Sequence, residues 1–477
     1  MQKGKIYRSL ALACMLSALG ACRLPALATR TENKNVPVAY SSPQDTSNTA
    51  HISWKDYFAD PYLSALIDTA LSRNQELNIT LQEIEIARNE VRARKGEYLP
   101  FVGLQAGAGM DKVARYTNIG AMEANAEIKP GKEMPEPLGD FALAARASWE
   151  VDIWHKLRNA KKAAVNRYLA SVEGRNFVVT NLVAEVADNY YELLVLDNEL
   201  DIVLKNIDVL NNALRIVKLE KEAAKVTELA VRKFEAEVLR TQSLQYGIQQ
   251  QITETENRIN FLLGRYPQHI QRSSVSFGDI VPKAVSAGIP SQLLTNRPDI
   301  RRAEQELAAA KLDVKVAKAR FYPSLGISAA VGYRAFNPTY LVDPASLLYS
   351  LAGDLMAPLV NRNAIKATYY TANAKQVQAV YNYERTILNG YVEVANQLSR
   401  ISNLARTYDM RSQQVQALTR SIDISTDLFR SARADYMEVL MTQRDALEAR
   451  FELIETKKQQ LNAMVSIYKA LGGGWNR

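Results

Sequence analysis

The sequence predicts an α+β protein in which one unit, a β-hairpin followed by a pair of long helices, occurs twice. Three observations predict this fold. The two halves of the 477-residue chain match each other, two stretches that each cover about a quarter of the chain contain no proline, and four short segments alternate between apolar and small or polar residues. A duplicated sequence, a lack of helix breakers and a period of two predict the repeat, the helices and the strands, respectively.

The composition excludes several other classes of protein. Hydrophobic residues make up 47% of the chain, which excludes a disordered chain, and two cysteines are too few for a disulfide scaffold. The three histidines, His51, His155 and His269, lie far apart and beside no cysteine cluster, so we expect no catalytic triad, no metal site and no enzyme. The net charge of +8 comes from basic residues interleaved with acidic ones, which indicates a solvated surface and not a nucleic-acid interface.

The first 22 residues have the features of a secretory signal. Basic residues precede the apolar run Ser9–Leu19, which is too short to cross a bilayer. The sequence Leu19-Gly20-Ala21-Cys22 looks like a bacterial lipobox, so we expect residues 1–21 to be removed and Cys22 to become the lipidated first residue. An ordinary signal peptide cleaved nearby is the alternative. Residues 22–53 are then expected to form a lipid-anchored, flexible tether.

The internal repeat is visible at two constant offsets. The larger offset aligns 74–109 with 297–332, and a smaller one, which we call the helix offset, aligns 185–264 with 393–472. Because the offsets differ, the first half carries about 15 extra residues, which we assign to the polar stretch Asp111–Gly139. We expect a first repeat over 54–264, with a hairpin at about 100–152 and a helix pair at about 155–264. A linker over 265–296 is expected to form an equatorial collar. The second repeat is expected over 297–472, with a hairpin at about 323–358 and a helix pair at about 362–471, followed by a tail over 473–477.

The stretches without proline predict helices of unusual length. Proline is absent from Leu138–Tyr266 and from Leu359–Arg477, and glycine is sparse in both. From Leu193 to Val217 apolar residues recur at alternating steps of three and four, which is the heptad seam of a coiled coil. A helix from about 157 to 219 would be roughly 95 Å long. No globular core needs such a length, so we expect the helices to span a distance.

The strands are predicted beside two matched prolines, Pro100 and Pro323, which we assign to helix-to-strand junctions. One face of each segment is apolar and the other is small or polar. The apolar positions are Val102, Leu104, Ala106 and Ala108; Phe141, Leu143, Ala145, Ala147 and Trp149; Leu325, Ile327, Ala329, Val331 and Tyr333; and Leu347, Tyr349, Leu351 and Leu355. Alternation over about 10–12 residues is typical of a transmembrane β-barrel, and a soluble sandwich with one wet face is the alternative.

Four strands cannot close a barrel, and an open sheet edge cannot face lipid because its backbone amides would lack partners. We therefore expect the chain to share its barrel with copies of itself, eight strands in a dimer or twelve in a trimer. The polar strand face would then line a water-filled conduit that continues into a helical tube.

Four motifs carry a resemblance to a known family. They are Trp54–Leu63, Leu262-Leu263-Gly264, Asn296–Glu304 and Phe321–Leu325. In order and with the duplication, they make the mature chain similar to the TolC-type outer membrane factors, in particular the NodT/OprM-type lipoproteins that serve tripartite efflux pumps. The first half departs from the pattern in one place, where Gln75 stands at the position of Pro298 in the second half.

The resemblance implies a homotrimer in the outer membrane, with a twelve-stranded β-barrel continued by a periplasmic α-helical coiled-coil barrel. It implies a periplasmic adaptor (membrane fusion) protein and an inner-membrane transporter as partners, contact with outer-membrane lipid, and no cofactor apart from the lipid on Cys22. The function it implies is passive conduction of drugs or other small solutes from the periplasm to the exterior by an RND-type system, as in multidrug resistance.

The resemblance also places a gate at the periplasmic tip, around 429–444. We predict a partly hydrophobic seal from Met437 and Met441 and an acidic ring from Asp435 or Glu438. Asp445 is a further acidic candidate, and Arg444 could form an ion pair. These charges could instead merely solvate a helix end.

Other functions remain open from the residues alone. An outer membrane duct for type I secretion or for metal-cation efflux would have a similar sequence. A periplasmic adaptor lipoprotein predicts a single helical hairpin, and a purely structural coiled-coil protein leaves the four alternating segments unexplained.

Overall fold

The computed structural model describes residues 25–40, 47–273, 277, 280, 286–358, 360, 362–431 and 433–475. The predicted signal peptide and Cys22 lie outside the described residues. The described residues form two compact units, which we call the sheet unit (within 25–31, 85–169 and 305–381) and the helical unit (within 32–84, 170–304 and 382–475). No helix in the described part of the chain has a stretch of 18 residues that is apolar enough to cross a bilayer.

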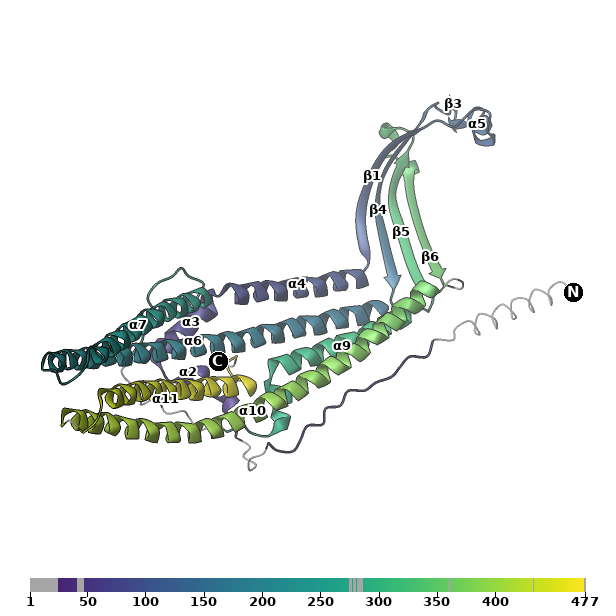
Figure 1. The fold of residues 1–477 in the computed structure, drawn as a ribbon. Coiled ribbons are helices and arrows are strands. Elements are labelled where there is room, and N and C mark those ends of the chain that lie inside the picture. The colour runs from purple at the N-terminus through teal and green to yellow at the C-terminus, as the bar shows by residue number, and fades with distance from the viewer. Residues whose placement is uncertain are drawn as a thin grey trace. The chain divides into compact units, whose positions relative to one another are not determined.

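The sheet unit is built around four long antiparallel strands, which lie side by side in the order β1-β4-β5-β6 (Figure 1). Their bounds are Phe101–Asp111 for β1, Leu138–Val151 for β4, Ser324–Ala335 for β5 and Leu347–Met356 for β6. Pro100 lies between the first helix of this unit and β1, and Pro323 lies directly before β5. A proline suits these places because it ends a helix and need not donate to the strand ladder.

The two hairpins differ in the loop at their far end. The loop between β1 and β4 covers 112–137 and is more than twice as long as the loop between β5 and β6, which covers 336–346. This difference in length accounts for the extra residues of the first half. The longer loop folds into small elements of its own: α5, Asn118–Glu123; β2, Glu127–Lys129; and β3, Lys132–Glu133. The shorter loop contains the 3-10 turns η4, Pro338–Tyr340, and η5, Pro344–Ser346.

The long helices repeat as the helix offset predicts. They are α4, Gln75–Tyr98; α6, Lys156–Glu222; α7, Glu228–Leu262; α9, Pro298–Ala319; α10, Asn363–Arg430; and α11, Tyr436–Ala470. Moving the bounds of α7 by the helix offset reproduces those of α11, and the same shift brings α6 to within one residue of α10. At 67 residues, α6 is about 100 Å long.

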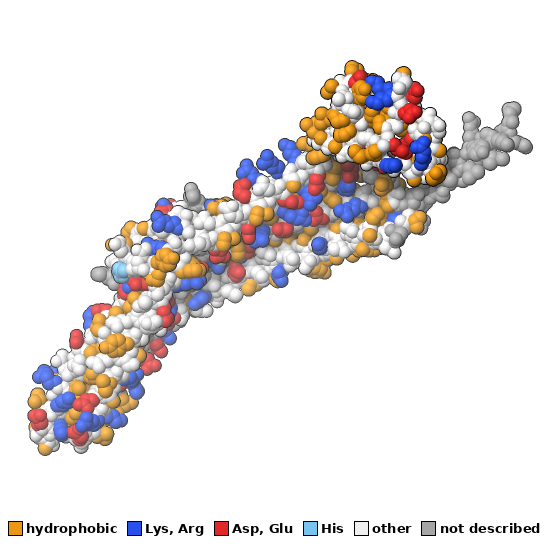
Figure 2. All heavy atoms as spheres, turned by 90° about the horizontal axis from the view of Figure 1, so that it is seen from above, with side chains coloured by type: hydrophobic (Ala, Val, Ile, Leu, Met, Phe, Trp, Pro, Cys, Tyr) orange, Lys and Arg blue, Asp and Glu red, His pale blue; other side chains and the backbone are white. Residues whose placement is uncertain are grey.

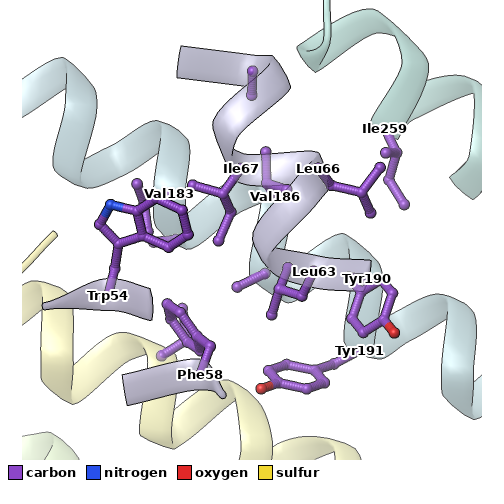
Figure 3. Close-up of a cluster of buried hydrophobic side chains, with 14 of the residues drawn as sticks. Trp54, Phe58, Leu63, Leu66, Ile67, Val183, Val186, Tyr190, Tyr191 and Ile259 are labelled. Carbon is purple, nitrogen blue, oxygen red and sulfur yellow. The ribbon is translucent and has the colours of Figure 1, made fainter. Parts of the chain in front are cut away.

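The core of the helical unit lies where short N-terminal helices pack on the long ones. The short elements are η1, Thr49–His51; α2, Trp54–Phe58; and α3, Pro61–Arg73. In Figure 3, Leu63 and Ile67 of α3 pack near Val186 and Tyr190 of α6, all of them buried. The hydroxyl of Tyr57 donates to the carbonyl of Met464 at 2.8 Å, which ties α2 to α11.

The described part of the linker between the repeats packs on the same helices. The Ile270 and Phe277 side chains are buried in the core of the helical unit. Arg272 binds both carboxylate oxygens of Asp197 on α6, at 2.7 and 2.8 Å, and also Glu256 on α7. Beyond these contacts the linker forms η3, Pro290–Gln292, and α8, Leu293–Asn296.

The N-terminal segment differs from the flexible tether expected from its composition, because residues 25–40 lie extended against α10. In the sheet unit, Arg30 stacks on the ring of Tyr381 at 4.1 Å and donates to its hydroxyl. In the helical unit, the backbone amide of Asn33 donates to Glu384 at 3.0 Å, and Tyr40 stacks on Tyr391. The reason is that α10 carries aromatic and acidic side chains that bind the segment, a property that polarity and proline content do not reveal.

Candidate functional site

The four strands bring their apolar positions onto one face of the sheet. The register places Val102 beside Ala147, Ala147 beside Ala329, and Ala329 beside Leu351, so the predicted apolar positions form continuous rows. This face is exposed: Leu104, Tyr349 and Leu351 are 85%, 82% and 79% accessible. So large an apolar surface indicates contact with lipid or with another protein.

The opposite face of the sheet is hollowed and is lined by small and polar residues. The hollow has a volume of about 880 Å³, and its lining includes Gly103, Gln105, Gly107, Ala142, Arg146, Ser148, Ser328, Arg334 and Ser350. The guanidinium of Arg334 on β5 donates two hydrogen bonds of 2.7 Å to the carboxylate of Asp140 on β4. Leu348 and Met356 also fall on this face, opposite Gly332 and Ser324, as the irregular alternation of the fourth segment predicts. Such a face is compatible with water.

The sheet ends in two open edges, because β1 and β6 each have one hydrogen-bonded neighbour among the described residues. An edge strand exposes a row of unpaired N–H and C=O groups, which is unfavourable in lipid. A sheet with one lipid-compatible face, one wet face and two open edges is therefore suited to be a segment of a larger barrel.

The helices leave the sheet through a defined junction. The carboxylate of Asp152, which is buried, accepts hydrogen bonds of 2.9 Å from the backbone amides of Leu157 and Arg158 at the start of α6. Trp154 stacks on Tyr322, and its indole N–H donates to the carbonyl of Pro323 at 2.7 Å. Pro323, the junction proline of the second repeat, is thus joined to aromatic residues of the kind expected where a barrel meets the membrane surface.

The other ends of the long helices form two equivalent turns. The backbone amide of Lys225 donates to the carbonyl of Glu220 between α6 and α7, and that of Arg433 donates to Leu428 between α10 and α11. The helix offset relates the two donors and also the two acceptors, so the turns are copies of each other. Phe234 is buried in an apolar cluster close to these turns. Side chains of both charge signs are intermixed along the helices (Figure 2).

The predicted gate residues divide between two environments. Asp435 is the exposed N-cap residue of α11, and Glu438 is exposed in the first turn of that helix. Met437 is half-buried against the apolar cluster near the turn, whereas Met441 is 48% accessible. Arg444 and its neighbour Asp445 are exposed and approach each other to 3.8 Å.

A groove of about 430 Å³ brings three of these residues together with α7. It is lined by Met437, Met441 and Arg444, with Leu440, and by Arg232, Lys233, Ala236, Glu237 and Arg240 of α7. Asp435 and Glu438 are not part of its lining. The α7 side of the groove is absent from the sequence-based candidates, because the helix offset shows that α7 and α11 are equivalent in the repeat but not that they lie side by side.

Two carboxyl groups on α6 have raised pKa values. Burial raises the pKa of Asp188 to about 7, although Lys469 and Arg400 oppose the shift. Burial also raises the pKa of Glu199 to about 7, against the effect of Lys458. Both groups lie in the helical unit and far from the sheet in sequence, and no group of three or more His, Cys, Asp or Glu among the described residues is placed to hold a metal ion.

Comparison with known proteins agrees with this geometry. The family model "Outer membrane efflux protein" matches residues 66–265 and 289–473. The chain is 28% identical to the pyoverdine export outer membrane protein OpmQ of Pseudomonas aeruginosa, over 98% of this chain and 96% of the relative. It is 24% identical to the probable outer membrane lipoprotein SilC of Salmonella typhimurium, over 92% of this chain and 90% of the relative.

Among solved structures, the outer-membrane channel OprN superposes with a TM-score of 0.83 at 24% identity, covering 94% of this chain and all of that one. The fold class predicted from the sequence, with two hairpins and long helices, is thereby confirmed, and so is the predicted resemblance. The chain belongs to the outer membrane efflux protein family.

Proposed function

We propose that the chain is the outer-membrane channel subunit of a tripartite, RND-type efflux system, which conducts drugs or other small solutes passively from the periplasm to the exterior. The observation that carries the proposal is the four-stranded sheet with one exposed apolar face, one hollowed polar face and two open edges. Family membership supports it independently.

The assembled form that we propose is a homotrimer with a barrel of twelve strands. The test is the mobility of the protein from outer-membrane fractions in detergent gels, with and without heating. We expect a band of trimer size that collapses to the monomer on boiling, because strand pairing between subunits leaves the shared barrel without open edges. A stable monomer in water without detergent would contradict the proposal.

We infer that Cys22 carries the lipid anchor. The lipobox supports this, and so does the name of the relative SilC, a probable lipoprotein. Asn373 lies on α10, ten residues after the start of this helix, and its side-chain amide donates to the backbone carbonyl of Ala28. The start of α10 follows shortly after β6. The six residues from Cys22 to Ala28 can span at most about 20 Å, enough to reach the start of α10. Mass spectrometry of the mature N-terminus should detect diacylglycerol on Cys22, and Cys22→Ser should abolish it.

For the gate, we propose that Met441 and Met437 form the apolar part of the seal and that Glu438 or Asp435 provides the acidic ring. The exposure of Glu438, Asp435 and Met441 beside the turn supports these roles. Conductance of Glu438→Ala and Met441→Asp channels in planar bilayers tests them. Removal of the carboxylate should weaken cation preference, because a ring of like charges attracts counter-ions. Unchanged conductance and selectivity in both variants would exclude these residues from the gate.

The proposed partners are a periplasmic adaptor and, through it, an inner-membrane transporter. The groove between α7 and α11 supports adaptor binding there, because buried Leu440 lines it together with Arg232 and Arg240, whose ion pairs with Glu228, Glu235 and Glu237 offer charges of both signs. Charge reversal at Arg232 and Arg240, both on α7 and outside the gate candidates, should reduce crosslinking to the adaptor and drug resistance in cells while leaving the trimer intact. Full resistance in that variant would place the binding site elsewhere.

A further inference from the structure

The hollowed face of the sheet carries an arginine without an ionic partner. Arg146 lies near the middle of β4, opposite Gly103 of β1 and Ala330 of β5, so small residues flank it on both sides. Its side chain is exposed and lines the hollow, and it makes no ion pair with the described residues. Arg334, on the same face, is instead neutralised by Asp140.

The same face carries a carboxylate without an ionic partner, nearer to the helices. Asp354 of β6 lies opposite Gly326 of β5. A Cβ atom at Gly326 would lie 2.6 Å from the Asp354 Oδ1 atom, so the carboxylate extends over the glycine backbone. Glu150 is the other neighbour of Gly326, but it is paired with Lys156. Asp354 forms no ion pair within the described part of the chain.

The register fixes the distance between these two charges along the sheet. Gly326 aligns Asp354 with Glu150, and Glu150 is four residues from Arg146 along β4. At about 3.4 Å per residue, the row of cross-strand positions that contains Arg146 and the row that contains Asp354 are about 14 Å apart. This spacing exceeds the Debye length of about 10 Å at 0.1 M salt, so each row acts on a passing ion separately at that ionic strength.

We propose that Arg146 and Asp354 form two rings of opposite charge inside the assembled channel, and that they determine which charged solutes pass the sheet segment. The inference rests on the proposed function, in which the hollowed face lines the water-filled lumen. Arg146 attracts anionic groups and Asp354, nearer the helices, attracts cationic groups. A solute with separated charges of both signs interacts favourably with both rings.

The test is the reversal potential of purified channels in planar bilayers under a KCl gradient. At about 0.1 M salt we expect Arg146→Gln to shift the chloride-to-potassium permeability ratio about twofold toward potassium, and Asp354→Asn to shift it about twofold toward chloride. Both shifts should disappear at about 1 M, where the Debye length is only about 3 Å. The two variants are also compared in a Glu438→Ala background, which removes a charge proposed for the tip.

Two controls separate charge from structure. Arg146→Lys keeps the charge and should retain the wild-type ratio, and the double variant Asp140→Asn/Arg334→Gln removes a neutral pair and should also retain it. If Arg146→Gln fails to assemble, Arg146→Cys is treated in the preformed channel with cationic or anionic thiol reagents, which should shift the ratio in opposite directions. The mature chain is expected to offer no other free thiol, since the sequence holds only Cys14 and Cys22.

The inference would be overturned if wild type, Arg146→Gln and Asp354→Asn all form conducting channels and have the same reversal potential at about 0.1 M salt. A wild-type protein that forms no conducting trimer would instead contradict the proposed function.

Discussion

Each repeat closes with an equivalent contact, which we call the corner: the residue directly before α4 or α9 donates a hydrogen bond to the last residue of α7 or α11. The side chain that donates differs between the two repeats. In the first half, the Asn74 amide donates to the carbonyl of Leu262 at 2.9 Å; in the second half, Arg297 donates to the carbonyl of Ala470 at 2.8 Å. Leu262 and Ala470 are equivalent in the repeat and occupy the last position of α7 and of α11. A helix end leaves carbonyl groups without intrahelical partners, so each repeat must supply a donor there.

The glycine after each helix shows the same constraint. Gly264 and Gly472 both have positive φ, +65° and +88°, and a Cβ atom would lie 2.5 Å from the carbonyl of Arg73 or 2.6 Å from that of Asn296. The backbone of the corner is therefore held constant in both repeats, whereas the donor can change from an amide to a guanidinium. Unlike the amide, the guanidinium of Arg297 is charged. Asp299 and Glu393, which belong to the same repeat, neutralise this charge.

The largest expected difference between the corners is in the cost of removing the donor. Arg297→Ala removes a buried guanidinium and its hydrogen bonds to Ala470, Asp299 and Glu393, and should lower the free energy of unfolding by about 2–4 kcal/mol, because the carboxylates that it leaves are partly solvated. Asn74→Ala removes neutral hydrogen bonds and should cost about 1–2 kcal/mol. Thermal unfolding of the purified protein, followed by circular dichroism, measures both. Equal losses would mean that the charge adds nothing to the second corner.

The two corner glycines should instead respond alike. Gly264→Ala and Gly472→Ala each force a Cβ atom against a carbonyl in a left-handed conformation, for an expected cost of about 2–3 kcal/mol. Gly247→Ala, within α7, is the matched control: nothing lies within 4 Å of the added Cβ, so it should stabilise the helix by ~0.5–1 kcal/mol. A tolerated substitution at either corner would show that the backbone there can rearrange.

A third comparison uses pH. Asp188 of α6 corresponds to Asn396 of α10 under the helix offset. Because burial raises the pKa of Asp188 to about 7 from 3.8, the folded protein binds this proton more tightly than the unfolded chain does, and stability declines as the pH rises from about 4 to 7. Asp188→Asn should therefore stabilise the protein by ~1–2 kcal/mol at about pH 8, with allowance for partial solvation, and by nothing at about pH 3.5. Melting curves at both pH values measure it, and an equal gain at both would refute the assignment to ionisation.

The smallest effect is expected from the N-terminal segment, which stacks on aromatic residues of α10 and also pairs Lys34 with Glu304 of α9. Tyr381 of α10, which binds Arg30, corresponds to Glu173 of α6, so the first repeat lacks the aromatic contact. Arg30→Ala should cost only ~0.5–1 kcal/mol, because an exposed cation–π contact is weak. Limited proteolysis should show faster cleavage within residues 25–40, with Arg30→Lys as the control. An unchanged cleavage rate would mean that the other contacts suffice to hold the segment.

Much of the fold follows from periodicity and symmetry in the sequence. The period of two places Val102, Leu143 and Val331 on one face, and the helix offset anticipates the equal lengths of α7 and α11. These features are local or repeated, so a single chain reveals them. The path of residues 25–40, the tie from Arg297 to Ala470 and the groove between α7 and α11 depend on which distant segments meet, and no local pattern encodes that. The gate candidates are intermediate, since their helix is predictable but their facing side chains are not.

The unequal loops of the two hairpins have a consequence for the cell surface. In the proposed trimer, residues 112–137 and 336–346 would alternate around the outer rim, with three long projections between three short ones. An antibody or a phage directed at residues 112–137 would therefore find three equivalent attachment points per channel, each on a loop that contains a short helix and a two-stranded sheet.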